Sequence, residues 1–76
     1  MNMQSVNAVN LGRFQYTDNE KIIEEDYMIE LNMDYIESVT EYEVANKPYV
    51  RINLVSGAYI IMRSADYFLQ IYPEIH

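Results

Sequence analysis

Carboxylates and phenols, rather than nucleophiles, are the reactive side chains of this 76-residue chain. Residues 18–43 hold ten acids and a single base, Lys21, which gives that segment a formal charge of −9 in a chain of net charge −7. The acids are Asp18, Glu20, Glu24, Glu25, Asp26, Glu30, Asp34, Glu37, Glu41 and Glu43. Such a segment repels phosphate backbones and anionic membranes, and it attracts a basic surface on another protein. We therefore expect a basic protein partner, no direct nucleic-acid binding and no membrane association. The alternative is that the carboxylates only keep a tyrosine-rich domain in solution.

The side chains that most enzymes use are missing or badly placed. The chain has no cysteine, and its one histidine, His76, is the last residue of the sequence, where a general base is hard to position. Its four serines have no neighbouring base, and its two glycines are isolated. Glu24, Glu25 and Asp26 could offer oxygens to a hard cation, but no calcium-loop pattern surrounds them. We expect neither an enzyme, nor a cofactor, nor a metal site.

Eight tyrosines are many for a chain of this length. Tyrosine combines a large apolar ring with a hydroxyl, which is why it is enriched at protein interfaces. Seven of them follow the acidic run 24–26 and cannot all fit into so small a core: Tyr27, Tyr35, Tyr42, Tyr49, Tyr59, Tyr67 and Tyr72. We expect some at an interface, although cross-strand aromatic pairs would also account for them.

The N-terminal third gives conflicting signals. Residues 1–10 contain three asparagines and no charge, which favours a poorly ordered arm or a short edge strand. A strand can follow from Val9, ending at a polar turn at residues 17–19. Thr17 and Glu20 have the spacing of a capping box and could instead open a short helix as far as Asp26. We favour a turn with a short helix-like stretch, because three consecutive acids suit neither a paired strand nor a core.

The rest of the chain alternates as half-buried strands do, over residues 28–33, 36–44, 49–54 and 58–63. A bend at residues 32–34 and turns at 45–48 and 55–57 separate these strands. Ser64 is a suitable N-cap for a helix that Pro73 ends, and we expect its apolar residues to pack on the sheet. Those residues are Phe68, Leu69, Ile71 and Tyr72.

The sequence therefore predicts an α+β, mainly β domain over residues 11–76, an antiparallel meander of three to four strands with a short C-terminal helix. No apolar run approaches the ~20 residues that span a bilayer, and a chain without cysteine suits the cytoplasm. A core this small leaves apolar surface uncovered, so we expect a homodimer.

Three stretches resemble the flagellar FlbD family of small proteins: 31–44 (LNMDYIESVTEYEV), 50–64 (VRINLVSGAYIIMRS) and 66–72 (DYFLQIY). The shared positions are Leu31, Asn32, Asp34, Ile36, Glu37, Val39, Glu41, Val50, Ile52, Leu54, Gly57, Tyr59, Ile61 and Ser64. The resemblance implies a hairpin followed by a short helix. The composition, tiny, acidic and aromatic-rich, also resembles that of small phage-encoded inhibitors.

Two functional hypotheses follow. The first is an acidic binding module, of the phage or mobile-element inhibitor type, that mimics nucleic acid on a basic host protein, as an anti-CRISPR, anti-restriction or polymerase inhibitor would. Its partner-binding residues are Glu24, Glu25, Asp26, Tyr27, Glu30, Tyr35, Glu37, Glu41, Tyr42 and Glu43. The second is an FlbD-like structural or regulatory protein that acts by self-assembly or subunit assembly. The self-association residues are Tyr49, Tyr59, Phe68 and Tyr72.

Overall fold

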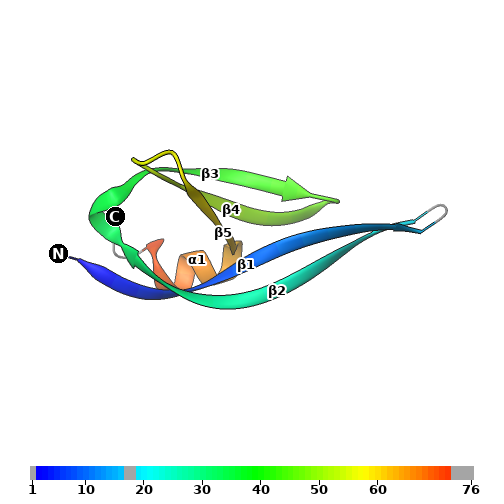
Figure 1. The fold of residues 1–76 in the computed structure, drawn as a ribbon, viewed down its shortest axis with the longest axis horizontal. Coiled ribbons are helices and arrows are strands. Elements are labelled where there is room, and N and C mark those ends of the chain that lie inside the picture. The colour runs from blue at the N-terminus through cyan, green and yellow to red at the C-terminus, as the bar shows by residue number, and fades with distance from the viewer. Residues whose placement is uncertain (1, 17–18, 73–76) are drawn as a thin grey trace.

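The computed structural model describes residues 2–16 and 19–72 as two antiparallel sheets and a short C-terminal helix (Figure 1). Strands β1 (Met3–Tyr16) and β2 (Asn19–Asn32) form a long hairpin. Strands β3 (Ile36–Val44), β4 (Lys47–Leu54) and β5 (Tyr59–Arg63) form a sheet in the order β3-β4-β5, and helix α1 (Ser64–Gln70) follows. The expected mainly β class with a C-terminal helix is confirmed. The proposed turn at Thr17 and Asp18 and the stop at Pro73 lie outside the described residues.

The expectation of a poorly ordered arm at residues 1–10 is wrong. Residues 3–10 form the first part of β1 and pair with β2 in a continuous register, in which Val6 lies opposite Ile29. Val6, Ala8 and Val9 are all buried. Asn7 between these residues and Asn10 after them hide the apolar pattern in the sequence, and β2 supplies the backbone partners that an isolated arm would lack.

Residues 19–26 belong to β2, so the expectation of a short helix-like stretch there is also wrong. In a strand, successive side chains point to opposite faces, which separates Glu25 from its two acidic neighbours. Glu24 and Asp26 then share a face, and both reach Arg63 on β5. The ion pairs with Arg63 stabilise this segment as a strand. Because Arg63 lies far along the chain, the local sequence could not indicate this outcome.

The connections of the three-stranded sheet match the sequence signals. The bend after β2 is a 3-10 turn, η1 (Met33–Tyr35), in which the Asn32 side chain accepts a hydrogen bond from the Asp34 N–H at 3.0 Å. Ala45 and Asn46 both have positive φ, 49° and 66°, as a tight hairpin turn requires. Gly57 supplies the positive φ of 94° in the next turn.

Helix α1 differs from expectation in its cap and in its buried face. Arg63, not Ser64, is the N-cap residue, and no side chain caps the helix. Tyr67 and Ile71, one turn apart, are buried, while Phe68 and Leu69 are 54% and 80% exposed. A helix of two turns can bury only one narrow stripe, and the stripe used here includes a tyrosine that the sequence pattern did not single out.

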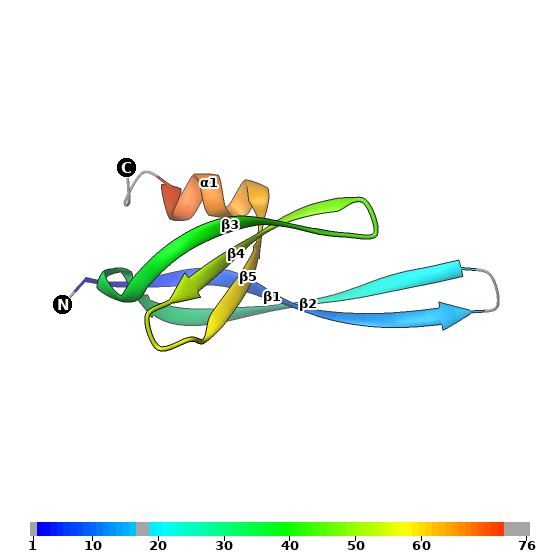
Figure 2. The same cartoon turned by 90° about the horizontal axis from the view of Figure 1, so that it is seen from above.

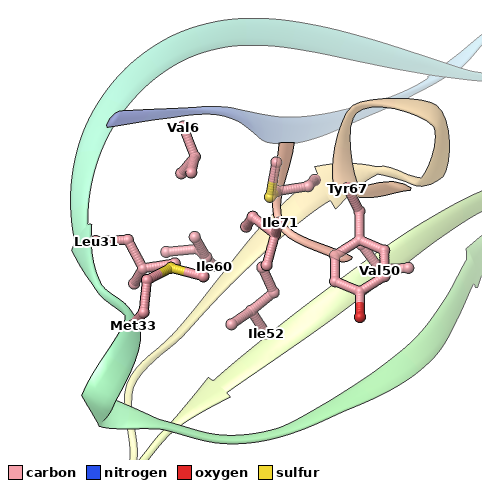
Figure 3. Packing of buried hydrophobic residues seen from close by; sticks show 9 residues of the cluster. Val6, Leu31, Met33, Val50, Ile52, Ile60, Tyr67 and Ile71 are labelled. Carbon is pink, nitrogen blue, oxygen red and sulfur yellow. The ribbon is translucent and has the colours of Figure 1, made fainter. Parts of the chain in front are cut away.

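Two apolar clusters form the core. The larger one gathers buried residues from β1, β2, β4, β5, η1 and the α1 region (Figure 3), and Ile36 and Val39 of β3 pack against it. Its buried members are Val6, Leu31, Met33, Val50, Ile52, Ile60, Met62, Tyr67 and Ile71. The smaller cluster consists of Val9, Val44, Tyr49 and Ile61. Val6 of β1 packs in the larger cluster and Val9 of the same strand packs in the smaller one, so the hairpin connects the two clusters.

Strand β5 connects the two layers of the molecule. In Figure 1, β3 and β4 lie on one side and the hairpin on the other, and β5 runs between them to pack against β1. Figure 2 shows the hairpin extending well beyond the sheet and the helix, in a molecule of 48 × 20 × 19 Å. Within the described residues, no helix is long and apolar enough to cross a membrane.

Candidate functional site

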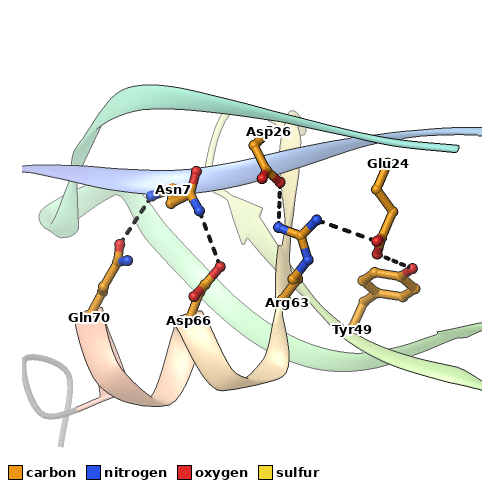
Figure 4. A network of polar contacts seen from close by, with 7 residues as sticks. All are labelled: Asn7, Glu24, Asp26, Tyr49, Arg63, Asp66 and Gln70. Carbon is orange, nitrogen blue, oxygen red and sulfur yellow. Dashed lines mark hydrogen bonds and ion pairs between the residues drawn. The ribbon is translucent and has the colours of Figure 1, made fainter.

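A polar cluster at Arg63 joins the hairpin to the end of β5 (Figure 4). The Arg63 guanidinium contacts the carboxylate of Asp26 and, at 3.4 Å, that of Glu24. The Tyr49 hydroxyl donates a hydrogen bond of 2.6 Å to Glu24. This hydrogen bond and then the Arg63 charge lower the pKa of Glu24, whereas burial and the nearby carboxylate raise the pKa of Tyr49 to about 12.

A second set of polar contacts attaches α1 to β1. The Asn7 side chain donates to Asp66 at 3.3 Å, and the Asn7 backbone N–H donates to the Gln70 side chain at 3.0 Å (Figure 4). The Gln4 side chain donates to the Gln70 carbonyl at 2.6 Å. These contacts fix the helix against the hairpin and so hold its aromatic residues in position relative to the sheet.

The acids predicted to bind a partner have different surroundings. Glu24 and Asp26 are engaged with Arg63, so they stabilise the fold rather than offering free charge. Of the acids predicted to bind a partner, those that are exposed and have no ion pair or side-chain hydrogen bond among the described residues are Glu25, Glu30, Glu37, Glu41 and Glu43. The last three lie on β3, and the first two lie on β2 in the other sheet. Three of these five unpaired carboxylates therefore lie on a single strand, β3.

A groove of about 500 Å³ lies beside this strand and is bounded on its other side by α1. The residues that line it are Met33, Ile36, Glu37, Ser38, Val39, Thr40, Glu41, Val50, Tyr67, Phe68 and Tyr72. Residues 36–41 contribute without a gap, so the groove follows β3 over most of its length. We call this feature the β3–α1 groove.

Three aromatic rings form the helical wall of the β3–α1 groove. The rings of Tyr67, Phe68 and Tyr72 meet edge to face, with centroids 5.1 to 6.1 Å apart. Tyr67 is anchored in the core, and Phe68 is half exposed beside it. The groove thus combines an apolar aromatic wall with carboxylates on the facing strand, a combination suited to side chains that carry both a hydrocarbon stem and a positive charge.

The other predicted tyrosines do not gather in one place. Tyr27, Tyr42 and Tyr59 line a smaller cavity of about 210 Å³ between the hairpin and the sheet. Tyr35 borders a separate, mostly apolar cavity of about 400 Å³. Tyr49 is 3% exposed and lies in the smaller core cluster, so its predicted place in a self-association surface is wrong. The Tyr49 hydroxyl can be buried because Glu24 accepts its hydrogen bond.

Some residues of these sites had no signal in the sequence. Thr40 lies opposite Arg51 on the neighbouring strand, and the Arg51 guanidinium stacks 3.9 Å from the centroid of the Tyr59 ring. Arg63 is the last residue of the apolar strand β5. The one sequence signal that could have drawn attention to it is that the chain has just five basic residues. Ser38 and Thr40 border the groove because β3 is an edge strand, and local sequence does not encode strand order.

Comparison of the chain with protein-family models, curated protein sequences and solved structures gives no match. Within the part of the chain that the structure describes, no three carboxylate or histidine side chains converge as a metal site would require.

Proposed function

We propose that this protein is a small acidic binding module that captures a basic, nucleic-acid-handling protein and modulates or inhibits it. One observation carries the proposal: Glu37, Glu41 and Glu43 are exposed on one strand and have no counter-charge among the described residues. Carboxylates make the same bidentate contacts to arginine as phosphates do, so such a row can occupy a basic groove that otherwise binds nucleic acid. Action as an inhibitor of the phage-encoded type, in the cytoplasm of a host cell, is part of this proposal.

The arrangement of the internal charges supports this use of β3. Glu24 and Asp26 both form ion pairs with Arg63, whereas the side chains of the β3 acids form no ion pair or hydrogen bond among the described residues. Self-repulsion among unpaired carboxylates disfavours the compact state. A function in partner binding accounts for the placement of these acids on one strand better than solubility does, because acids at any exposed position would keep the protein in solution.

A capture experiment with matched charge variants tests the proposal. Glu37→Lys, Glu41→Lys and Glu43→Lys together change the net charge from −7 to −1, because each substitution adds two positive units. The control carries Glu25→Lys, Glu30→Lys and Asp34→Lys, which are exposed and change the net charge equally. We expect the tagged protein to capture a basic protein from lysate at low salt, the β3 variant to lose it, and the control to retain most of it.

Two further readouts make the test specific. A nucleic-acid oligonucleotide added to the purified partner should compete with this protein, and capture should weaken steeply with salt. Capture that ignores salt, competitor and the β3 substitutions alike would contradict the proposal.

Self-assembly through an apolar surface is the second candidate, and exposed Phe68, Leu69 and Tyr72 on and just after α1 favour it. A homodimer built on these residues would be FlbD-like in mode of action. Sedimentation at micromolar concentration distinguishes the candidates, since apolar assembly gives a dimer mass that Leu69→Ala with Phe68→Ala converts to a monomer mass.

A further inference from the structure

Strand β3 is an edge strand whose outer side is bordered by the β3–α1 groove. In the described residues it pairs with β4 alone, from Ile36 opposite Leu54 to Val44 opposite Lys47. An edge strand presents a row of backbone N–H and C=O groups that another strand can bind. Native edges are commonly covered by a helix or loop, yet here the helix stands back and leaves a groove along residues 36–41.

The β3–α1 groove has the dimensions of a binding site for side chains. At about 500 Å³ it lies within the range of cavities that hold ligands. A strand added to β3 would direct every second side chain toward the aromatic wall, at intervals of about 6.7 Å. Phe68 is more than half exposed there and would contact an aliphatic side chain or stem.

The charges around the groove select the occupant. Glu37 and Glu41 line it, Glu43 continues the row along β3, and none of the described residues that line the groove is basic. We propose that the β3–α1 groove takes an extended basic segment of a partner protein, which adds to the sheet as a strand beside β3. This inference rests on the proposed function and deepens it, because it names the form in which the basic partner is recognised.

A second copy of this chain fits the groove less well. Two β3 strands pairing antiparallel about a two-fold axis would place the carboxylates of both copies on the same face of a continuous sheet. Like charges opposite or diagonal to each other across strands are destabilising. A segment in which lysine or arginine alternates with aliphatic residues instead places its positive charges on one face of the added strand, where they can lie beside the carboxylate of Glu41.

A peptide probe tests the inference with the unaltered protein. The probe is an acetylated and amidated peptide of about seven residues in which lysine alternates with valine, long enough to pair along most of β3. We expect it to shift the backbone amide signals of residues 36–43 in an NMR titration. Two forms of the peptide, methylated on the backbone nitrogen of the odd or the even residues, remove donors from one edge or the other. One form should bind at least about tenfold more weakly than the unmodified peptide, and the other should bind within about twofold of it.

Matched variants place the peptide in the groove. Phe68→Ala and Glu41→Lys should each weaken binding several-fold, whereas Leu69→Ala and Glu25→Lys, exposed changes of the same kinds outside the groove, should not. Unfolding in urea checks that all four variants fold. Equal loss with Glu41→Lys and Glu25→Lys, or equal binding by both methylated peptides, would overturn the inference by showing unspecific attraction to acidic charge.

These failures are separate from failure of the proposed function. If strand addition is wrong but the module does capture a basic partner, salt and nucleic acid still displace that partner while the methylated peptides behave alike. If instead the groove binds only a second copy, sedimentation gives a dimer that the peptide does not dissociate, and the inference is overturned.

Discussion

Arg63 joins the β1–β2 hairpin to the three-stranded sheet through ion pairs. Its guanidinium lies between two carboxylates of β2, and one of these, Glu24, also accepts a hydrogen bond from the Tyr49 hydroxyl. A buried phenol without a partner would cost stability, so Glu24 makes the burial of Tyr49 in the smaller core cluster possible. One carboxylate that sequence reasoning assigned to a partner surface is thus part of the internal architecture.

Replacement of Tyr49 by phenylalanine should reveal this coupling. The ring stays in the core, but the hydrogen bond to a charged acceptor is lost, so we expect the free energy of unfolding at neutral pH to fall by about 1.5 kcal/mol. The pKa of Tyr49 is raised to about 12 in the folded state, above its ordinary value of 10. Its contribution is therefore complete below pH 10 and is lost as the pH rises toward 12.

Urea unfolding at neutral pH and at several values between pH 10 and 12 checks this prediction. Tyr49→Phe should lose less stability on alkalinisation than the unaltered protein. Burial also raises the pKa of Tyr67, so part of the alkaline loss should persist in the variant. Tyr59→Phe is the control, because that ring is half exposed and its contact with Arg51 needs no hydroxyl. An alkaline profile of Tyr49→Phe identical to that of the unaltered protein would argue against the coupling.

At the scale of elements, local patterns predicted the three-stranded sheet but not the hairpin. Apolar residues recur at every second position in β4, at Val50, Ile52 and Leu54, and positive φ occurs at Asn46 and Gly57, which tolerate it. In the hairpin, by contrast, asparagines and acids occupy positions whose burial or ion pairing depends on strands far along the chain. The β3–α1 groove depends in addition on strand order and helix placement, so the sequence could suggest its acids and aromatic residues but not their juxtaposition.

The first half of β1 should contribute to the stability of the fold, which a disordered arm would not do. Val6 is 0% exposed and contributes to the larger cluster. Val6→Ala removes two buried carbons and leaves a cavity, so we expect a loss of about 2 kcal/mol in the free energy of unfolding. Met3→Ala, at a position that is 44% exposed on the same strand, should cost less than about 0.5 kcal/mol. Chemical denaturation of both variants decides the matter, and equal small effects would mean that β1 is not held in the core.

At the scale of the whole molecule, charge opposes compactness. The chain carries −7, and most of its acids lie on the two strands β2 and β3, while Arg63 neutralises only Glu24 and Asp26. Repulsion among exposed acids acts over many ångströms and is screened by salt, whereas the contacts of Arg63 are partly shielded from solvent and respond less. The two effects of salt therefore have opposite signs, and the long-range repulsion involves more charges.

We accordingly expect salt to stabilise the protein. Between about 0.01 and 0.15 M NaCl the Debye length falls from ~30 to ~8 Å, which removes most of the repulsion between β2 and β3. Because this repulsion weakens, the free energy of unfolding should rise by about 1 kcal/mol over this range. The triple variants at Glu37, Glu41 and Glu43 and at Glu25, Glu30 and Asp34 both have a net charge of −1, so both should be nearly insensitive to salt. Urea midpoints at several NaCl concentrations measure these slopes. If the protein instead loses stability as salt is added, the ion pairs of Arg63 contribute more than the repulsion does. In that case the β3 carboxylates do not destabilise the fold, and partner binding is not needed to compensate for them.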